Sequence, residues 1–308
     1  MIQKGISLKN FTSYKIGGPA KLFAEFSSVK DLGDILSQCE GEKIFILGGG
    51  TNVLFDDKGF DGLVLKNKIN SIEDIDQNKI KFGGGVPFGQ AVAYSANQNL
   101  SGFEWAGGLP GTIAGAVRGN AGSFGGETKD NLLEVESFDL KTRKKLTRNN
   151  EGCKFGYRTS IFKTPEAKDE IIVSATFDFQ AGDKSKIKEI ARKNAVYRNE
   201  KQPQNPSAGS TFKGVKLENI PTEVREKFKE KIKSDPFPLI PAAVFIAGAD
   251  LISKKIGGAE VSQIHPNFLV NASGATSDDV KRLIKFVQDQ VSEKFKVELE
   301  PEIEIVGY

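Results

Sequence analysis

The residues that could do chemistry in this 308-residue chain are mostly glycines, because the side chains that usually bind metals or activate nucleophiles are scarce. The chain has 33 Gly but only one His and two Cys. A zinc site needs about four Cys, His or carboxylate ligands, and Cys39, Cys153 and His265 stand far apart in the sequence. A Ser-His-Asp triad would have to use His265. We therefore expect no metal site and a chemistry that does largely without histidine.

Glycine is concentrated in two segments that could bind a diphosphate. Gly48, Gly49 and Gly50 directly follow an apolar run, and the segment from Gly107 to Glu127 contains eight Gly among 21 residues. Glycine allows the backbone to approach a ligand and to point successive N–H groups at phosphate oxygens. Tight turns between strands are the alternative explanation. Neither G-K-[ST] nor G-x-G-x-x-G occurs in the chain, so a P-loop and a Rossmann dinucleotide site are not predicted.

Charge and composition exclude several classes of protein. The net charge is +3, from 43 basic and 40 acidic residues, and this balance, without a basic tail, argues against a nucleic-acid-binding protein. The N-terminal region lacks the apolar core of a signal peptide. The longest apolar stretch is broken by prolines, so no membrane span is predicted. Two distant cysteines in such a chain are expected to be free thiols in a reducing cytoplasm.

The first 182 residues alternate short apolar runs with glycine clusters, which favours a mixed α/β or α+β domain. Runs typical of strands occupy residues 43–47, 62–66, 79–85, 134–140 and 170–179. Apolar residues at helical spacing occupy 29–39 and 88–97. The first glycine segment therefore directly follows a predicted strand. The sequence becomes rich in charged residues after residue 182, which predicts a domain boundary there.

Residues 183–308 show three helical patterns and an alternating end. The helices are marked by Ile187, Ile190 and Ala191, by Val224, Phe228 and Ile232, and by Val280, Leu283, Ile284, Val287 and Val291. Thr276 and Asp279 offer a capping box for the third helix. Residues 295–308 predict a strand that Pro301 confines to an edge or divides in two. Its alternation puts Glu298, Glu300, Glu302 and Glu304 on one face and Leu299, Ile303 and Ile305 on the other.

Seven segments, spread in order along the chain, carry a resemblance to a known family. They are NFTSYKIGGPA (10–20), ILGGGTNVLF (46–55), GFEWAGGLPGTIAGAVRGNAGSFGGETKD (102–130), FGYRTS (155–160), YRNEKQPQNPSAGSTFK (197–213), IGGAEVSQIHPNFLVN (256–271) and LEPEIEIVG (299–307). Each one alone is weakly specific. Together they show that the chain resembles the UDP-N-acetylenolpyruvoylglucosamine reductase family over its whole length, in the branch with the shorter loop.

The resemblance implies an α+β fold. Residues 1–182 would form an FAD-binding domain of the vanillyl-alcohol-oxidase (PCMH) type, built from two α/β subdomains divided near residue 70. Residues 183–308 would form a C-terminal α+β substrate-binding domain. The FAD diphosphate would contact Gly48, Gly49, Gly50, Thr51, Asn52, Pro110, Gly111, Thr112, Gly115 and Gly122. Because residues 1–182 contain no His, a histidyl link to FAD is excluded there, and noncovalent FAD is expected.

The reaction that the resemblance implies uses NADPH to reduce FAD, after which flavin N5 delivers hydride to the vinyl carbon of UDP-N-acetylglucosamine enolpyruvate. Negative charge develops on the adjacent carbon and its carboxylate, and protonation of that carbon gives UDP-N-acetylmuramate. The family pattern assigns Arg158 to the developing enolate, Glu302 to orienting Arg158 or the substrate carboxyl, and Ser210 to proton donation. Without the resemblance these would be an ordinary surface Arg, a solvated Glu and a turn Ser, because sequence spacing cannot bring them together.

The nucleotide half of the substrate would contact basic residues near the start of the second domain. Lys201 matches a family lysine near the substrate diphosphate, and Arg198 and Lys213 are further substrate-binding candidates. A solvated basic helix end is the alternative explanation. The chain departs from the family pattern at Ala247 and Gly214, so the prediction of uridine contacts does not extend to these two positions.

Two other functions remain open from the sequence. An FAD-linked oxidase of a 2-hydroxy acid on the same fold would account for the first 180 residues but not for SAGSTFK and LEPEI. A catalytically inactive nucleotide-sugar-binding protein would be expected to have lost Arg158, Ser210 or Glu302, and all three are present. The reductase reading predicts a cytoplasmic, monomeric enzyme of peptidoglycan synthesis, and so of cell-wall biogenesis, cell shape and cell division. Its partners would be small molecules, with no nucleic acid and no membrane.

Overall fold

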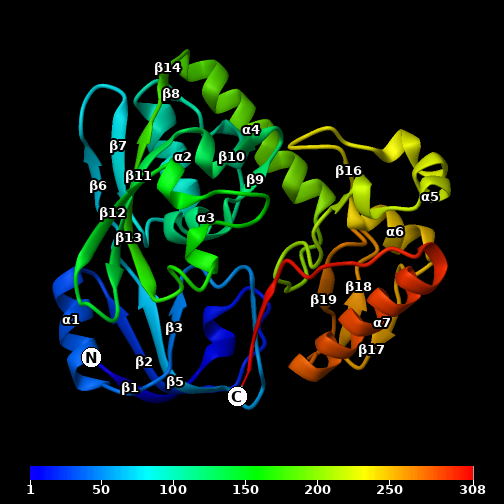
Figure 1. Cartoon of the computed structure of the whole chain (residues 1–308), viewed down its shortest axis with the longest axis horizontal. Coiled ribbons are helices and arrows are strands. Elements are labelled where there is room, and N and C mark those ends of the chain that lie inside the picture. The colour runs from blue at the N-terminus through cyan, green and yellow to red at the C-terminus, as the bar shows by residue number, and fades with distance from the viewer. Residues whose placement is uncertain (308) are drawn as a thin grey trace. The chain divides into compact units, whose positions relative to one another are not determined.

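The computed structural model describes residues 1–307, and their contacts group them into two compact units. Unit 1 consists of Met1–Gly5, Lys21–Gly49 and Asp61–Arg198, and unit 2 of Ile6–Ala20, Gly50–Phe60 and the described residues from Asn199 onward. Figure 1 labels most of the helices and strands of both units. Unit 2 therefore combines two short N-terminal segments with the C-terminal part of the chain. The domain boundary near residue 182 and the subdivision near residue 70 stay predictions.

A four-stranded sheet covered by one helix forms the first part of unit 1. In spatial order the strands are β1 (Gln3–Ser7), β2 (Pro19–Phe26), β5 (Phe60–Asn67) and β3 (Ile44–Leu47). Helix α1 (Val29–Gln38) begins after Ser28, whose side chain accepts a hydrogen bond from the N–H of Asp31. Leu32 and Ile35 of this helix are buried in the sheet's core. The predicted strands at 43–47 and 62–66 and the predicted helix at 29–39 are confirmed.

A five-stranded antiparallel sheet forms the second part of unit 1. In spatial order its strands are β12 (Lys145–Asn149), β11 (Leu132–Asp139), β13 (Glu170–Asp178), β7 (Lys79–Gly83) and β6 (Ile72–Asp74). Helices α2 (Phe88–Asn97) and α3 (Ile113–Gly119) share its hydrophobic core. The rings of Phe103 and Phe177 meet there at 4.9 Å between centroids, and burial of each contributes about 1.5–3 kcal/mol. The predicted strands at 79–85, 134–140 and 170–179 and the predicted helix at 88–97 are confirmed.

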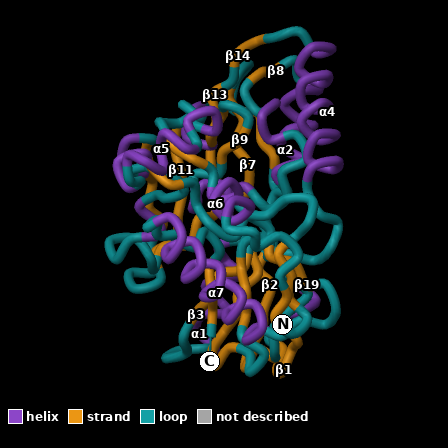
Figure 2. The backbone as a smooth tube through the Cα atoms, turned by 90° about the vertical axis from the view of Figure 1, so that its right-hand side faces the viewer, coloured by secondary structure: helices purple, strands orange, loops and turns teal. Residues whose placement is uncertain are grey.

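Helix α4 (Lys184–Lys201), the long purple helix at the upper right of Figure 2, lies directly on the long glycine-rich segment. A Cβ on Gly107 would be 2.0 Å from the carbonyl oxygen of Ala191. A Cβ on Gly108 would be 2.9 Å from the Cα of Ala195. These two glycines are therefore required by contact with a helix backbone. Two short antiparallel pairs lie in the same unit: β8 (Leu100–Ser101) with β14 (Gln180–Ala181), and β9 (Gly122–Ser123) with β10 (Gly126–Glu127).

Unit 2 is built around helix α7 (Ser277–Phe295), which begins with the predicted capping box. Thr276 Oγ1 accepts a hydrogen bond from the N–H of Asp279 at 3.0 Å, and the Asp279 carboxylate accepts one from the N–H of Thr276 at 3.1 Å. The apolar face of α7 is buried in the core of this unit. The other elements are α5 (Thr222–Lys227), α6 (Ala242–Gly248), β4 (Val53–Phe55), β15 (Val215–Lys216), β16 (Leu239–Ile240), β17 (Lys255–Ile256), β18 (Ala259–Val261), β19 (Leu269–Asn271) and β20 (Glu304–Val306).

The predicted helix through Val224, Phe228 and Ile232 is shorter than its apolar spacing indicated. It is α-helical only over α5 and continues as a 3-10 turn at Lys229–Lys231, so Ile232 lies beyond it. Phe228, at the end of α5, packs its ring edge-on against Phe245 of α6, with 5.7 Å between centroids. The α-helix therefore ends at the residue whose ring packs against α6.

The predicted terminal strand is wrong over most of its length, because only β20 is a strand. Pro301 makes one isolated bridge, and the chain bends at Ile303. The bend shifts the alternation of faces, so that Ile305, which was expected on the buried face, is 44% exposed. Strand β20 pairs in parallel with β4. Tyr308, the last residue of the predicted strand, lies outside the described residues.

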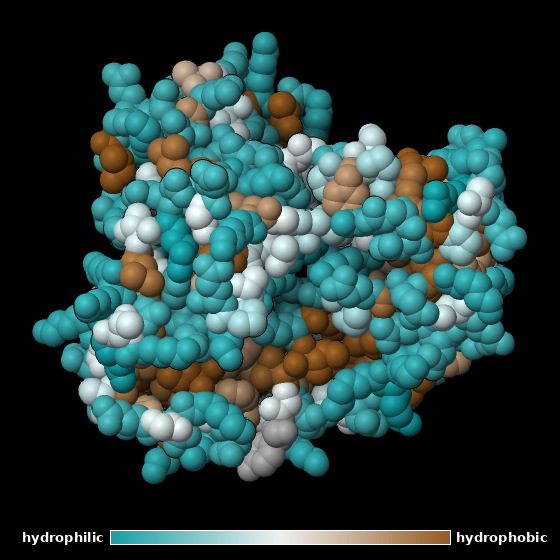
Figure 3. Space-filling model, in the orientation of Figure 1, coloured by the Kyte–Doolittle hydropathy of each residue, from teal (hydrophilic) through white to brown (hydrophobic). Residues whose placement is uncertain are grey.

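The exposed residues and the two cysteines were further subjects of the sequence analysis. The face of the molecule drawn in Figure 3 is mostly hydrophilic. Among the described residues, no helix is long and apolar enough to cross a membrane. Within residues 1–307, no group of three or more His, Cys, Asp or Glu is arranged to hold a metal ion. Cys39 and Cys153 are buried free thiols, as predicted, and burial raises the pKa of Cys153 to about 11.

Candidate active site

The two glycine segments meet within unit 1. Strand β3 ends at Leu47, so Gly48 and Gly49 leave the sheet at the carboxyl end of a strand. A Cβ on Gly49 would lie 2.7 Å from the Cα of Gly111. A Cβ on Gly48 would lie 2.8 Å from Oγ1 of Thr112. The backbones of the two predicted cofactor-binding segments are therefore in contact, and this contact leaves no room for side chains on Gly48 and Gly49. We call it the glycine contact.

Thr112 is the N-cap residue of α3 beside this contact. Its hydroxyl accepts a hydrogen bond from the N–H of Gly115 at 3.4 Å. Pro110 is exposed shortly before it in the chain. Gly122 lies further along, in β9, where its carbonyl oxygen accepts a hydrogen bond from Arg158. The structure thus groups five of the predicted cofactor-binding residues: Gly48, Gly49, Gly111, Thr112 and Gly115.

The rest of the first glycine segment belongs to unit 2. Gly50 has a φ of +67°, and a Cβ there would lie 1.9 Å from the carbonyl oxygen of Phe11, so another residue would force the backbone to move. Thr51 is half-buried and Asn52 is exposed. The side-chain amide of Asn52 donates a hydrogen bond to the carbonyl oxygen of Glu302 at 3.1 Å. A predicted cofactor contact is thus attached to the segment of a predicted catalytic residue.

Ser210 and Glu302 lie in neighbouring segments of unit 2. The backbone N–H of Glu302 donates a hydrogen bond to the carbonyl oxygen of Thr211 at 2.8 Å. The N–H of Lys213 donates to the carbonyl oxygen of Glu300 at 2.9 Å. Ser210 and Glu302 are both half-buried. Backbone pairing therefore makes the segment after Ser210, the predicted proton donor, a neighbour of the segment of Glu302, the predicted orienting residue, although the two are far apart in the sequence.

Asn267 holds the segment after Ser210 in place, and sequence reasoning missed it. Its Oδ1 accepts a hydrogen bond from the N–H of Phe212 at 3.0 Å, and its Nδ2 donates to the carbonyl oxygen of Phe212 at 2.8 Å. Asn267 and Phe212 are both buried, so loss of these bonds would leave buried polar groups unpaired, at about 1–3 kcal/mol each. The N–H of Asn267 donates to Nδ1 of His265 at 3.3 Å, and burial lowers the pKa of this histidine.

Arg158 lies in unit 1, at a tight turn. Gly156 and Thr159 exchange backbone hydrogen bonds of 3.0 and 3.3 Å across the turn. Arg158 has a φ of +56°, a left-handed conformation that costs a residue with a side chain about 1–2 kcal/mol. Its Nη2 donates a hydrogen bond to the carbonyl oxygen of Gly122 at 2.8 Å. Nine other described residues with a side chain also have a positive φ, so this conformation assigns no role to Arg158, and its catalytic role stays a prediction.

Arg198 is buried in unit 1, and its guanidinium is bonded within that unit. Its Nε donates to the carbonyl oxygen of Gly107 at 2.9 Å, and its Nη2 donates to the hydroxyl of Ser123. The guanidinium carbon also lies 4.9 Å from the ring centroid of Phe124. Burial, with a smaller effect from the charge of Arg158, lowers the pKa of Arg198 to about 10. Arg198 thus anchors the β9–β10 hairpin, and its contact with substrate stays a prediction.

The two lysines predicted to bind substrate differ in their surroundings. Lys201 is exposed at the last residue of α4. Lys213 forms an ion pair with Glu300, and 21% of the Lys213 side chain is exposed. This pair lies on the two segments that the Glu302 and Lys213 backbone bonds connect. Substrate binding by Lys201 and Lys213 stays a prediction.

The predicted catalytic residues divide between the two units. Arg158 belongs to unit 1, together with Gly122 and Arg198. Ser210 and Glu302 belong to unit 2. The catalytic roles of these three residues stay predictions.

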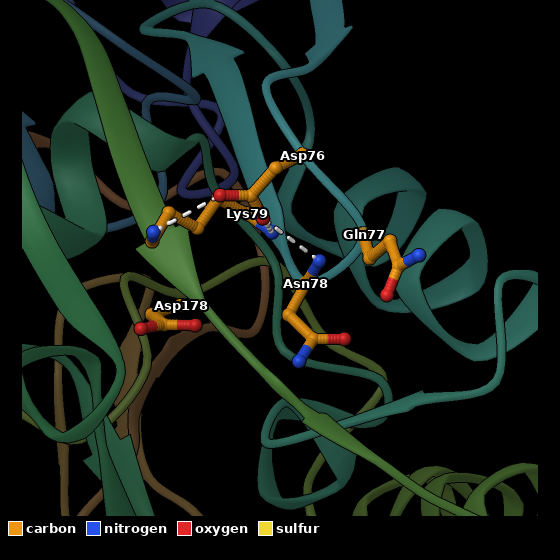
Figure 4. A pocket seen from close by; sticks show the side chains of 5 residues that line it. All are labelled: Asp76, Gln77, Asn78, Lys79 and Asp178. Carbon is orange, nitrogen blue, oxygen red and sulfur yellow. Dashed lines mark hydrogen bonds and ion pairs between the residues drawn. The ribbon is translucent and has the colours of Figure 1, made fainter.

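An open hollow of about 430 Å³ lies elsewhere in unit 1, at the turn between β6 and β7 (Figure 4). Its lining residues are Asp76, Gln77, Asn78, Lys79 and Asp178. The Asp76 carboxylate accepts hydrogen bonds from the N–H groups of Asn78 and Lys79 and forms an ion pair with the Lys79 ammonium. These polar groups serve the turn itself, and none of the predicted site residues is among them. The hollow therefore carries no argument about function.

The glycine contact has the chemistry of a phosphate-binding loop, and its contact with the diphosphate of FAD stays a prediction. Its atoms are backbone groups and the Thr112 hydroxyl, and the residues that form it, 48–49 and 111–112, include no Asp or Glu that would repel phosphate. The ammonium of Lys66, which sequence reasoning also missed, donates a hydrogen bond to the carbonyl oxygen of Gly48 at 3.3 Å. A cation, hydroxyl and side-chain-free backbone are the groups that phosphate-binding loops use.

Two models of known protein families match this chain, one in its N-terminal half and one in its C-terminal part. A family model described as an FAD binding domain matches residues 20–142. A model described as the C-terminal domain of UDP-N-acetylenolpyruvoylglucosamine reductase matches residues 202–306. These matches confirm the predicted α+β fold, with an FAD-binding domain of the PCMH type and a C-terminal domain of the reductase type.

Named relatives match over nearly the full length. The chain is 38% identical over 301 residues to UDP-N-acetylenolpyruvoylglucosamine reductase of Fervidobacterium nodosum, covering 97% of this chain and 89% of the relative. It is 37% identical over 309 residues to the reductase of this name from Protochlamydia amoebophila, covering 99% and 94%. The crystal structure of the reductase from Thermus caldophilus superimposes with a TM-score of 0.78 at 26% identity, covering 99% of this chain and all of the other. The chain belongs to the UDP-N-acetylenolpyruvoylglucosamine reductase family.

Proposed function

We propose that the chain reduces UDP-N-acetylglucosamine enolpyruvate to UDP-N-acetylmuramate, a step of peptidoglycan precursor synthesis, as an FAD-containing oxidoreductase that uses NADPH. The observation that carries this proposal within the chain is the backbone pairing of the segment after Ser210 with the segment of Glu302. This pairing joins the segments of Ser210 and Glu302, which are far apart in the sequence. Membership of the reductase family supports the same substrate.

FAD would be held noncovalently through its diphosphate. Gly48, Gly49, Gly111 and Thr112 form the glycine contact, and residues 1–182 contain no His to which FAD could be linked. Bound FAD supplies the hydride that the vinyl carbon receives. The cofactor contacts of Gly50, Thr51, Asn52, Pro110, Gly115 and Gly122 are part of the same proposal.

Side chains of this protein would stabilise the negative charge that develops on the substrate and would donate one proton. As the vinyl carbon gains hydride, the neighbouring carbon and its carboxylate gain negative charge. The planar guanidinium of Arg158 would pair with that charge, because its fork matches a carboxylate. Glu302 would orient Arg158 or the substrate carboxyl, and the Ser210 hydroxyl would donate the proton to the neighbouring carbon. Substrate thus gains one hydride and one proton, and NADPH is oxidised to NADP⁺.

The nucleotide part of the substrate would lie near basic side chains. The Lys201 ammonium is exposed and would contact the diphosphate. Lys213 would contribute a second positive charge, which its ion pair with Glu300 holds in place. Arg198 would add a further positive charge for the substrate. It lies close enough to Arg158 for the charge of Arg158 to lower the pKa of Arg198.

The cellular setting follows from the substrate. A step of peptidoglycan precursor synthesis serves cell-wall biogenesis and, through it, cell shape and cell division. NADPH and nucleotide sugars are small soluble molecules, so we infer a cytoplasmic enzyme. We also propose that it works as a monomer.

The test is turnover with the natural substrate under anaerobic conditions. The purified protein should be yellow and should release FAD on denaturation. NADPH oxidation at 340 nm should be triggered by UDP-N-acetylglucosamine enolpyruvate and not by UDP-N-acetylglucosamine, which lacks the double bond. If only oxygen reoxidises the reduced flavin, an oxidase of the same fold is the correct function. A colourless protein that cannot be reconstituted with FAD would overturn both.

A further inference from the structure

Lys66 brings a positive charge to the glycine contact from a neighbouring strand. It lies in β5, where it pairs in register with Leu47, the last residue of β3. Its ammonium donates a hydrogen bond to the carbonyl oxygen of Gly48 at 3.3 Å. The same Gly48 lies against Thr112. All four residues belong to unit 1, so their mutual arrangement is that of one compact body.

The Lys66 ammonium is partly removed from water beside the glycine contact. The side chain is half-buried, and burial, with a smaller effect from the like charge of Lys68, lowers the pKa of Lys66. The opposing charge of Glu25 raises it to a lesser extent. A partly desolvated ammonium aimed at a side-chain-free loop is therefore an arrangement that an anionic ligand would stabilise.

We propose that Lys66 is a cofactor-positioning residue whose ammonium pairs with the diphosphate of FAD at the glycine contact. The proposal rests on FAD binding by residues 20–142, the range that the FAD-binding family model matches, and it adds a residue to that site. A charge-assisted hydrogen bond to phosphate is about twice as strong as a neutral one. Lys66 would thus add a full positive charge to the backbone and hydroxyl groups of the glycine contact.

A diphosphate could also come from the other nucleotides. NADPH and the UDP-linked substrate both carry one, so the experiment must separate the sources. Lys66 lies in the same unit as Gly48 and Thr112, two residues predicted to hold FAD. Of the residues predicted to hold the substrate, Lys201 and Lys213 belong to unit 2, and Arg198, in unit 1, bonds to Gly107 and Ser123 instead. The hydrogen bond of Lys66 to Gly48 itself therefore favours FAD as the source.

The test measures binding of FAD and of riboflavin, which lacks phosphate, to deflavinated protein by quenching of flavin fluorescence. Lys66→Met should weaken FAD binding by about 10- to 100-fold, the loss expected for one hydrogen bond to a charged group, and should leave riboflavin binding unchanged. Lys66→Arg should retain most of the affinity for FAD. Lys68→Met is the matched control, because Lys68 is exposed and two residues away, and it should bind FAD like the parent protein.

A second readout separates ligand binding from a structural role. Lys66→Met should lower the thermal midpoint of the FAD-loaded protein by more than it lowers that of the deflavinated protein. Equal loss of riboflavin and FAD affinity, or an equal fall of the midpoint with and without FAD, would assign Lys66 to folding and overturn the proposal. An unchanged FAD affinity with a raised KM for NADPH or substrate would assign the charge to another diphosphate and overturn it as well. If the parent protein binds no FAD, the failure lies with the family-based cofactor instead.

Discussion

The backbone N–H of Glu302 donates a hydrogen bond to the carbonyl oxygen of Thr211 at 2.8 Å, which places Glu302 beside the residue that follows Ser210. Asn267 bonds to both backbone groups of Phe212, one residue further along. The segment that carries the proposed proton donor is therefore held from two directions by buried hydrogen bonds. Such support is what a site needs to keep a hydroxyl within reach of a reacting carbon.

Removal of the Ser210 hydroxyl should affect one half-reaction only. In Ser210→Ala, reduction of the flavin by NADPH should remain nearly intact, because no proton donor to carbon is needed there. Reoxidation by substrate should slow by about 100-fold or more, the usual contribution of a general acid. Stopped-flow absorbance of the flavin measures both steps separately. Ser207→Ala, a half-buried serine in the same loop, is the control and should behave like the parent protein. Equal slowing of both steps in Ser210→Ala would contradict the proposed role.

A side chain at Gly49 should break the glycine contact. In Gly49→Ala the new Cβ would lie 2.7 Å from the Cα of Gly111, a distance that forces the backbone to shift. We expect weaker FAD binding and a lower flavin-to-protein absorbance ratio after purification. Gly33→Ala is the control, since a Cβ there meets nothing within 4 Å in helix α1. It should retain FAD and stabilise the protein by about 0.5–1 kcal/mol. Full flavin content in Gly49→Ala would show that the contact does not shape the cofactor site.

Because Arg158 has a positive φ, two substitutions at this position can separate its effect on stability from its effect on turnover. Glycine adopts positive φ without penalty, so Arg158→Gly should be more stable than Arg158→Ala by about 1 kcal/mol. Both variants should lose turnover by about 100-fold or more, because neither has a guanidinium for the developing charge. Thermal unfolding and anaerobic turnover are the two measurements. If turnover in both variants equals that of the parent protein, Arg158 has no role in the reaction.

The capping box of α7 makes part of the stability depend on pH. The backbone N–H of Thr276, with further hydrogen bonds from Gly258 and Arg282, lowers the pKa of Asp279 to about 2, below the usual value of about 3.9. The folded state thus favours the carboxylate, and its stabilising effect is present above about pH 4 and is lost as pH falls toward 2. Far-UV circular dichroism should show Asp279→Asn less stable by about 1 kcal/mol at neutral pH. The difference should vanish near pH 2, and a constant difference at every pH would contradict this assignment.

Local sequence signals predicted the elements whose formation depends on near neighbours. The apolar spacing over 29–39 and 88–97 gave helices α1 and α2, and Thr276 with Asp279 gave the start of α7. Each of these depends on residues within a few positions, where periodicity and capping act. The glycine segments predicted a diphosphate site, and the resemblance of seven segments to the reductase family implied FAD and the family, both of which the comparisons confirm.

Contacts between distant segments could be decided only by the tertiary structure. The alternation near the C-terminus predicted a long strand, but the bend at Ile303 reduced it to β20, which pairs with β4. No sequence pattern showed that Asn267 holds Phe212, or that Lys66 reaches Gly48. The physical reason is that these hydrogen bonds join residues that only burial of a common core brings together, and the free energy of that burial is not encoded in any single segment.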